Sequence, residues 1–401
     1  MRIALVSQQY PPETANGGIG SQTYIKAHGM ASLGHEVFVI SYSNDNNKHD
    51  YDDGDVRIIR IPGFDNRMSV YTDTAWWLTY SAEVSCAISE LNSGSPLDIL
   101  DFPDWGCEGY IYLLNRTEIN YIPTVIHIHG PLVMFAHTIN WPEPNSVFYN
   151  VGTAIEETCL KLADAIYSSS KCSADWCRKF YNIHDQPIPI IHTGVDTKLF
   201  HPVEIPKDSR LTIIFVGQIA PNKGVETLTE AACRLTKEYP DLKLRLLGRG
   251  DRNFTEKLRE KVIAYGLPDL LELPGFINQK DLPTELSRAH VFAAPSMYEG
   301  GPGFVYLEAM ACGLPVIGCE GSGLTEIVEN EVNGLLVPPG DVDVLVSTLR
   351  RILSNADMRE AIGKEALKYV KKEADSETSL LRLESFYKSV INRGINHRKI
   401  G

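Results

Sequence analysis

The chain has 401 residues, of which 43% are hydrophobic and 22% are charged. That length suits two domains of about 100–200 residues each, and that composition is typical of globular proteins. The formal net charge of −13 argues against a nucleic-acid partner held by backbone electrostatics.

The first segment, RIALVS at residues 2–7, is a short apolar run that predicts a buried strand rather than the core of a signal peptide. Longer stretches with helical periodicity separate it from further β-branched apolar runs, which lie at residues 36–41, 56–61, 97–102, 124–129, 165–170 and 187–193. Such alternation indicates parallel βαβ units covered on both faces. Residues 1–195 are therefore expected to form one doubly wound domain.

The loop NGGIGSQTY, residues 16–24, follows the first strand and contains Gly17, Gly18 and Gly20. Thr23 stands where a dinucleotide-binding G-x-G-x-x-G motif needs its last glycine, so an NAD enzyme is disfavoured. Glycines here let backbone N–H groups approach an anion at a helix start, or let a sugar approach the loop. We expect Gly18 and Gly20 to contact a ligand.

The acidic run NDNNKHDYDDGDV, residues 44–56, lies between two predicted strands. It lacks the glycine and terminal glutamate spacing of a calcium loop, so we expect a solvated loop and no metal. The eight cysteines show no metal-ligand spacing either. Reduced thiols in a cytoplasmic protein are the simplest interpretation.

The segment TVIHIHGPL, residues 124–132, places His127 and His129 on one face of a strand. His129 comes last, at the carboxyl end, where functional residues of open α/β sheets gather. Strand histidines are more often structural, and that interpretation is favoured for His127.

The second half repeats the plan of the first half. A polar, proline-bearing join at residues 196–210 leads to apolar runs at residues 211–219, 242–248, 270–276, 290–296, 314–319 and 334–340. We predict a second doubly wound domain over residues 196–375, and a last helix within residues 376–401 that packs back on the first domain. In such a pair the ligand is expected between the carboxyl ends of the two sheets.

The segment YEGGPGFVYLEAM, residues 298–310, predicts a loop after a strand and then a helix. The helix start would direct N–H groups at phosphate beside Gly301, Gly303 and Phe304. Glu308 could accept hydrogen bonds from the vicinal hydroxyls of a ribose. Glu299 would face a second polyol, such as a sugar.

This segment resembles the signature of the retaining glycosyltransferases of family 4, of the type found in bacterial polysaccharide synthesis. Similar stretches cover nearly the whole chain, at residues 8–41, 191–202, 216–231 and 321–341. The resemblance implies the GT-B fold, an α/β architecture of two Rossmann-like doubly wound domains facing across a cleft. It also implies that Glu299 contacts the donor sugar and Glu308 the nucleotide ribose.

The chain departs from the family pattern at two places. Eight residues separate Glu299 from Glu308, where the family usually has seven. Gln218 stands where the family commonly has arginine, whereas Lys223 is retained. Lys223 would then be the main cation on the diphosphate, with Arg249 as a compensating charge.

The resemblance extends to the remaining parts of the site. The nucleotide base would meet the backbone near Phe276 and Ile277, and His129 matches a position implied to contact the donor sugar or the reacting face. The segment DFPDWGCEGY, residues 101–110, resembles the acceptor side of the family. The acceptor residues implied there are Asp104, Trp105 and Glu108.

The resulting hypothesis is a retaining glycosyltransferase that moves a hexose, with glucose favoured, from a UDP-sugar to a saccharide or lipid-linked saccharide. His129, Lys223 and Glu299 would be catalytic, and neither metal nor cofactor would be required. A peripheral membrane contact stays open. Two alternatives also stay open: a GT-B epimerase acting on a UDP-sugar, and a catalytically silent nucleotide-sugar-binding protein.

Overall fold

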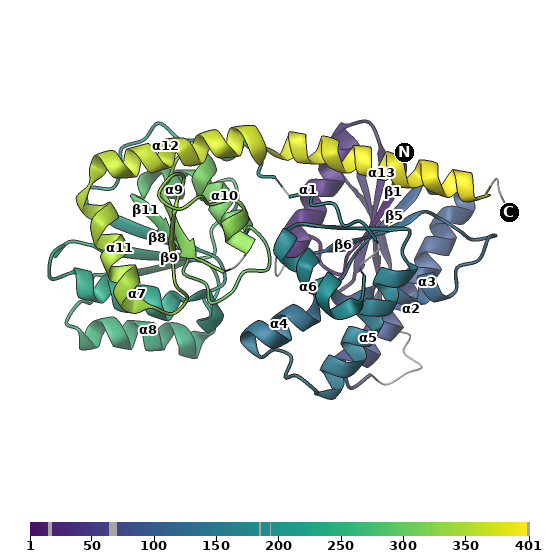
Figure 1. The fold of residues 1–401 in the computed structure, drawn as a ribbon, viewed down its shortest axis with the longest axis horizontal. Coiled ribbons are helices and arrows are strands. Elements are labelled where there is room, and N and C mark those ends of the chain that lie inside the picture. The colour runs from purple at the N-terminus through teal and green to yellow at the C-terminus, as the bar shows by residue number, and fades with distance from the viewer. Residues whose placement is uncertain (15–17, 64–69, 184–185, 193, 322, 399–401) are drawn as a thin grey trace. The chain divides into compact units, whose positions relative to one another are not determined.

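The computed structural model describes residues 1–14, 18–63, 70–183, 186–192, 194–321 and 323–398. The chain divides into two compact units, which are described separately. Unit 1 comprises Met1–Thr193 together with Glu377–Gly401, and unit 2 comprises Gly194–Ser376. Each is an α/β sandwich around one sheet (Figure 1).

The sheet of unit 1 has seven strands in the order β3-β4-β2-β1-β5-β6-β7. All neighbours pair in parallel except β3, which is antiparallel to β4. The strands are β1 (Arg2–Val6), β2 (Glu36–Tyr42), β3 (His49–Asp53), β4 (Val56–Ile61), β5 (Ile99–Pro103), β6 (Thr124–Ile128) and β7 (Ala165–Ser168).

Two apolar cores flank this sheet, because successive strand residues point to opposite faces. Ile3 and Leu5 of β1 join the core that includes α1 and the C-terminal helix α13, whereas Ala4 and Val6 join the core on the other face. The helices are α1 (Gly18–Ser32), α2 (Asp73–Gly94), α3 (Tyr110–Leu114), α4 (Leu132–Ile139), α5 (Val147–Leu162), α6 (Lys171–Tyr181) and α13 (Ser376–Arg398), with a 3₁₀ turn η1 (Trp105–Cys107). The last segment of the chain therefore completes the fold of its first domain (Figure 1).

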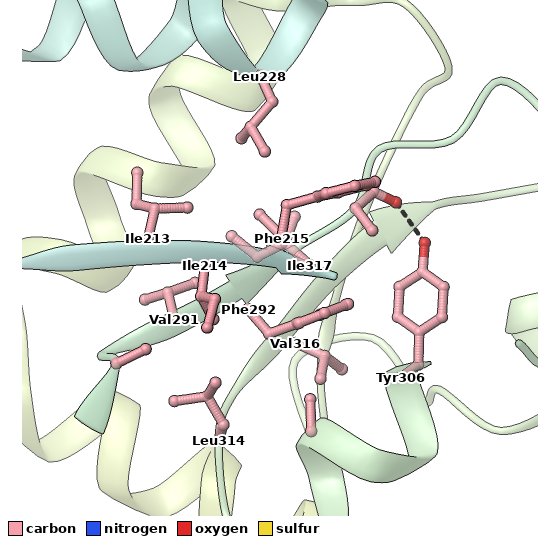
Figure 2. Close-up of a cluster of buried hydrophobic side chains, with 14 of the residues drawn as sticks. Ile213, Ile214, Phe215, Leu228, Val291, Phe292, Tyr306, Leu314, Val316 and Ile317 are labelled. Carbon is pink, nitrogen blue, oxygen red and sulfur yellow. Dashed lines mark hydrogen bonds between the residues drawn. The ribbon is translucent and has the colours of Figure 1, made fainter. Parts of the chain in front are cut away.

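The sheet of unit 2 has six parallel strands in the order β10-β9-β8-β11-β12-β13. These are β8 (Thr212–Val216), β9 (Lys243–Leu247), β10 (Leu271–Gly275), β11 (Val291–Ala293), β12 (Val316–Cys319) and β13 (Leu335–Val337). The connecting helices are α7 (Val225–Leu235), α8 (Arg252–Ala264), α9 (Leu282–Arg288), α10 (Phe304–Ala311), α11 (Val342–Ser354) and α12 (Ala356–Glu373), with 3₁₀ turns η2 (Pro221–Lys223) and η3 (Gly323–Glu326). Figure 2 shows the fully buried apolar side chains of β8, β11 and β12 in its centre.

The two sheets confirm the predicted fold class, but two local predictions were wrong. Residues 49–53, predicted as a solvated loop, form β3, an exposed edge strand whose backbone pairs with β4. Conversely, the predicted strand over residues 187–193 pairs, in its described part (187–192), through a single bridge between Ser168 and Ile190. Backbone pairing at a sheet edge does not require apolar side chains, so the hydrophobic pattern missed β3. Apolar side chains do not by themselves produce strand pairing, so the same pattern wrongly predicted a full strand at residues 187–193.

The strand order reverses at one point in each sheet. In unit 1, β1 lies between β2 and β5, and in unit 2, β8 lies between β9 and β11. Loops leaving the carboxyl ends of such a strand pair diverge to opposite faces of the sheet, which leaves a crevice for ligands. These two edges carry the candidate site residues.

Candidate functional site

The loops that follow β8 and β11 in unit 2 pack backbone against backbone. Gly224 has a φ of +66°, and a Cβ built there would lie 1.8 Å from the Pro295 carbonyl oxygen. Met297 N donates to Asn222 O at 2.9 Å. Only glycine satisfies both the positive φ and the close approach, so Gly224 holds the lysine-bearing turn η2 against the glutamate-bearing loop.

This contact brings together two residues predicted to be catalytic. Lys223 Nζ donates to Glu299 Oε1 at 2.7 Å. Their side chains are 29% and 18% exposed, so a ligand could reach both. The ammonium group can bind an anion, and the carboxylate can accept from hydroxyls, once a ligand competes for the pair.

The turn that follows Glu299 depends on a close approach of two glycines. Gly323 N donates to Glu299 O at 2.9 Å, and a Cβ on Gly323 would lie 2.6 Å from the Cα and carbonyl carbon of Gly301. Gly303 precedes α10 with a φ of +69° and carries no side chain that could cap the helix. The helix N-terminus thus keeps the bare backbone that a phosphate contact requires, with Phe304 as its first residue.

Helix α10 is anchored by Tyr306 and carries Glu308. The buried Tyr306 hydroxyl donates to the Ala294 carbonyl just beyond β11 (Figure 2). Glu308 is 8% exposed. Burial raises the pKa of Glu308 to about 7, while a hydrogen bond with Gln279 acts in the opposite direction. Sequence reasoning missed Gln279, because no local pattern marks a loop amide that meets a helix carboxyl distant in the chain.

The remaining unit 2 predictions fall on the same sheet edge. Ile219 N donates to Arg249 O at 2.8 Å, which ties the loop with the exposed Gln218 to the loop with Arg249. The Arg249 guanidinium lies 5.0 Å from the ring centroid of Phe276, which is 62% exposed. Ile277 packs against the core. This edge therefore presents a cation and an exposed aromatic face side by side.

In unit 1, Asp104 organises the backbone around His129. One carboxylate oxygen, Oδ1, accepts from Trp105 N at 2.9 Å and from His129 N at 3.0 Å, while Oδ2 accepts from Gly130 N at 3.1 Å. Burial raises the pKa of Asp104 to about 6, and these backbone bonds oppose the rise. The carboxylate is thus committed to the turn that presents His129, although the sequence assigned it to the acceptor.

Glu108, the second acidic residue assigned to the acceptor, has no exposed surface. Its Oε1 accepts from Gln8 N at 2.8 Å, and burial raises its pKa to about 8. Trp105 is half-buried and stacks on Trp141 with ring centroids 5.6 Å apart. Glu108 therefore supports the loop after β1 as a neutral acid, whereas the adjacent Trp105 keeps part of its surface free.

The glycine-bearing loop is described only in part. Helix α1 begins at Gly18, where an added Cβ would meet no atom of the described residues within 4 Å, and Gly20 is buried in its first turn. Gly17 lies outside the described residues. The open space at Gly18 is compatible with close approach of a ligand to this helix start.

The residues whose placement is described contain no group of three or more His, Cys, Asp or Glu side chains able to hold a metal ion. Among these same residues, no helix is long and apolar enough to cross a membrane.

Comparisons with known proteins identify the family of the chain. The sequence model "Glycosyltransferase Family 4" matches residues 16–199, and "Glycosyl transferases group 1" matches residues 196–369. The chain is similar to the alpha-D-kanosaminyltransferase of Streptomyces kanamyceticus, with 32% identity over 276 residues, which cover 64% of this chain and 67% of that protein.

Solved structures share the fold. The sucrose-phosphate synthase of Thermosynechococcus elongatus matches with a TM-score of 0.84 and 23% identity, over 98% of this chain and 99% of that one. Anabaena Alr3699/HepE in complex with UDP-glucose matches with a TM-score of 0.74 and 18% identity, over 97% of this chain and 100% of that one.

Proposed function

The chain belongs to the family 4, group 1 glycosyltransferases of GT-B fold, and on this premise we propose that it transfers a hexose with retention of configuration. The donor is a UDP-hexose, with glucose as the first candidate, and the acceptor is a saccharide or lipid-linked saccharide. The observation that carries the proposal is the Lys223–Glu299 pair at 2.7 Å, at the strand-order reversal of unit 2. The fold match to a UDP-glucose complex supports the choice of donor.

Each group at this edge has a separate task in the proposal. Lys223 and the first turn of α10 bind the diphosphate, Glu308 accepts from the ribose hydroxyls, and Glu299 accepts from the hexose. The base meets Phe276 and Ile277, with Gln218 and Arg249 as further polar contacts. Unit 1 binds the acceptor, and His129 meets the transferred sugar.

The proposed reaction exchanges one bond for another at C1 of the hexose. The bond from C1 to the β-phosphate oxygen breaks, and the acceptor oxygen bonds to C1 on the same face. The acceptor proton passes to the departing diphosphate, so no protein carboxylate needs to attack C1. Lys223 and helix-terminal N–H groups stabilise the charge that develops on the leaving group, without a resident metal.

The first test is thermal unfolding with UDP, GDP, ADP or NAD. A ligand at a hundred times its Kd stabilises by about 2.7 kcal/mol, which is a shift of several degrees. We expect UDP to raise the midpoint, and Lys223→Met or Glu308→Ala to abolish that rise. Lys237→Met is the matched control, because Lys237 is an exposed lysine in the turn after α7, outside the site.

Transfer itself is tested with UDP-glucose, with and without a panel of oligosaccharides, by NMR of the product anomer. An α-linked product supports retention. Isomerised donor in the absence of acceptor would indicate an epimerase instead, and UDP binding without transfer or donor hydrolysis would indicate a silent binding protein. A midpoint raised only by NAD would overturn the nucleotide-sugar site.

A further inference from the structure

A buried lysine in unit 1 contacts His127, which lies in β6, two residues before His129. Lys26 of α1 is 7% exposed, and its ammonium group has three neighbours. Nζ lies 2.9 Å from Asp101 Oδ2, 3.2 Å from the Tyr167 hydroxyl and 3.4 Å from His127 Nδ1. An ammonium group has three N–H donors, so these three contacts use all of them.

The carboxylate that neutralises Lys26 is fixed by two tyrosines. Asp101 Oδ2 accepts from the Tyr167 hydroxyl at 2.6 Å and also from the hydroxyl of Tyr387. Tyr387 has no exposed surface and belongs to α13, nearly three hundred residues further along the chain. The C-terminal helix thus supplies a hydrogen bond to a buried ion pair whose two residues, Lys26 and Asp101, belong to the N-terminal half of the chain.

These contacts determine which nitrogen of His127 carries the proton. An ammonium group donates and cannot accept, so Nδ1 must face Lys26 with a lone pair. The proton is then on Nε2, which lies 2.7 Å from the Ser169 hydroxyl. His127 is therefore a neutral imidazole, because a second proton on Nδ1 would face the ammonium group directly.

His129 lies next to His127, with ring centroids 3.8 Å apart. Burial lowers the pKa of both histidines well below the ordinary value, and the charge of Lys26 lowers both further. Within the described residues, His129 Nδ1 is buried without a hydrogen-bond partner. A buried lone pair without a partner costs less free energy than a buried N–H group or a buried charge without a partner. The His129 proton is therefore best placed on Nε2, which leaves a lone pair on Nδ1.

We propose that Lys26, held by Asp101 and by Tyr387 of α13, is a positioning residue that keeps the His127–His129 pair uncharged and in one tautomer. His129 then presents a neutral N–H donor, which suits a sugar hydroxyl or ring oxygen and adds no charge to the site. The structural part stands on the geometry, whereas its catalytic consequence rests on the proposed function. Among the charged and titratable groups, Lys26 and Tyr167 contact His127, and Asp104 accepts from the backbone of His129. Asp101 and Tyr387 lie behind them, with Asp101 bonded to Lys26, Tyr167 and Tyr387.

The test combines NMR with kinetics. Long-range ¹H–¹⁵N spectra of ¹⁵N-histidine-labelled protein report the tautomer and charge of each ring nitrogen. In the wild type, we expect His127 and His129 to stay neutral, with protons on Nε2, between pH 5 and pH 8. Lys26→Met should let the His127 signals shift toward the other tautomer or titrate in that range, and Tyr387→Phe should do so more weakly.

Two controls separate the proposal from general damage to the fold. Tyr112→Phe removes another buried hydroxyl of unit 1, one that donates to Asn120 O, and should leave the histidine signals unchanged. The double variant Lys26→Met with Asp101→Asn removes both charges of the buried ion pair together. If Lys26→Met alone does not fold, the double variant is measured in its place. Unchanged histidine signals in every folded Lys26 and Tyr387 variant would overturn the proposal.

The kinetic arm uses the same variants with UDP-glucose. If the His129 ring moves or its proton leaves Nε2, kcat should fall by roughly tenfold, which is the effect of one pK unit. The KM for the donor should change little. Because the NMR result needs no turnover, a wrong donor or reaction would leave the tautomer result standing. Altered tautomers with unchanged kcat would assign Lys26 to structure alone and refute its positioning role.

Discussion

Lys223 donates a 2.7 Å hydrogen bond to Glu299, so the cation proposed for the diphosphate and the carboxylate proposed for the hexose neutralise each other. The glycine contact between the η2 turn and the loop after β11 creates this pair. A donor molecule would have to replace this internal contact with contacts to both partners. Its diphosphate would take the ammonium group while its hexose takes the carboxylate.

The pair predicts opposite effects on binding and on transfer. Glu299→Gln releases Lys223 from its internal partner, so the affinity for UDP should rise, by up to about fivefold for a part-exposed ion pair. The same variant should lower kcat, because the amide accepts less strongly from the hexose. Lys223→Met should instead lower the affinity for UDP. Calorimetric titration with UDP distinguishes the two, and equal weakening in both variants would contradict the assignment.

Glu308 predicts a pH-dependent affinity for the nucleoside. Its pKa is about 7, and only the carboxylate can accept from both ribose hydroxyls. Affinity for uridine, which carries no titrating phosphate, should therefore fall as pH drops through 7, approaching about tenfold per unit at low pH. Glu308→Gln should bind weakly and without this dependence. Titration at pH 6, 7 and 8 measures it, and a flat wild-type profile would argue against ribose recognition by Glu308.

Glu108 predicts a stability that falls as pH rises. Its pKa is about 8 in the folded protein against an ordinary value of 4.5, so the folded state keeps a proton that the unfolded state releases. The stabilisation is complete below about pH 4.5 and is lost as pH rises through 8. Glu108→Gln supplies a neutral group of the same shape and should remove this slope. Urea unfolding at several pH values checks it, with the exposed Glu118→Gln as control.

Asp104 predicts a linked loss of stability and turnover. Asp104→Ala leaves three backbone N–H groups, the one of Gly130 buried and the other two part-buried, without their acceptor, at a cost of about 1–3 kcal/mol for each that water cannot reach. The turn that holds His129 should loosen, so kcat should fall together with the free energy of unfolding. Chemical denaturation and steady-state kinetics measure both. Full activity at normal stability would show that the turn does not need this clamp.

A side chain at Gly224 should destabilise the protein by steric overlap with Pro295, an effect that can be measured separately from backbone strain. Gly224→Ala puts a methyl group 1.8 Å from the Pro295 carbonyl oxygen, in addition to the strain at φ +66°. Gly266 has a similar φ of +74° but nothing within 4 Å of an added Cβ, so Gly266→Ala reports strain alone, about 1 kcal/mol. We expect the Gly224 variant to lose substantially more stability and most UDP binding. Equal losses would mean that the two loops separate easily.

Much of the fold could be predicted because its signals are local. The segment at residues 298–310 forms a loop and then a helix, as predicted, with the helix beginning at Phe304 directly after Gly303. Apolar strand runs were recognisable for the same reason, since a strand buried on both faces must be apolar throughout. The polar strand β3 was missed because its pairing uses only the backbone.

The fold class and the family could be inferred from the sequence alone, and a set of candidate site residues could be proposed from it, because side-chain type, spacing and periodicity are properties of the chain. The contacts that those side chains make could be found only in the folded structure. It paired Lys223 with Glu299, committed Asp104 to backbone N–H groups, and brought Tyr387 to Asp101. Burial, protonation state and hydrogen-bond partners depend on neighbours distant in sequence, and those neighbours are assembled only when the sheets and helices pack.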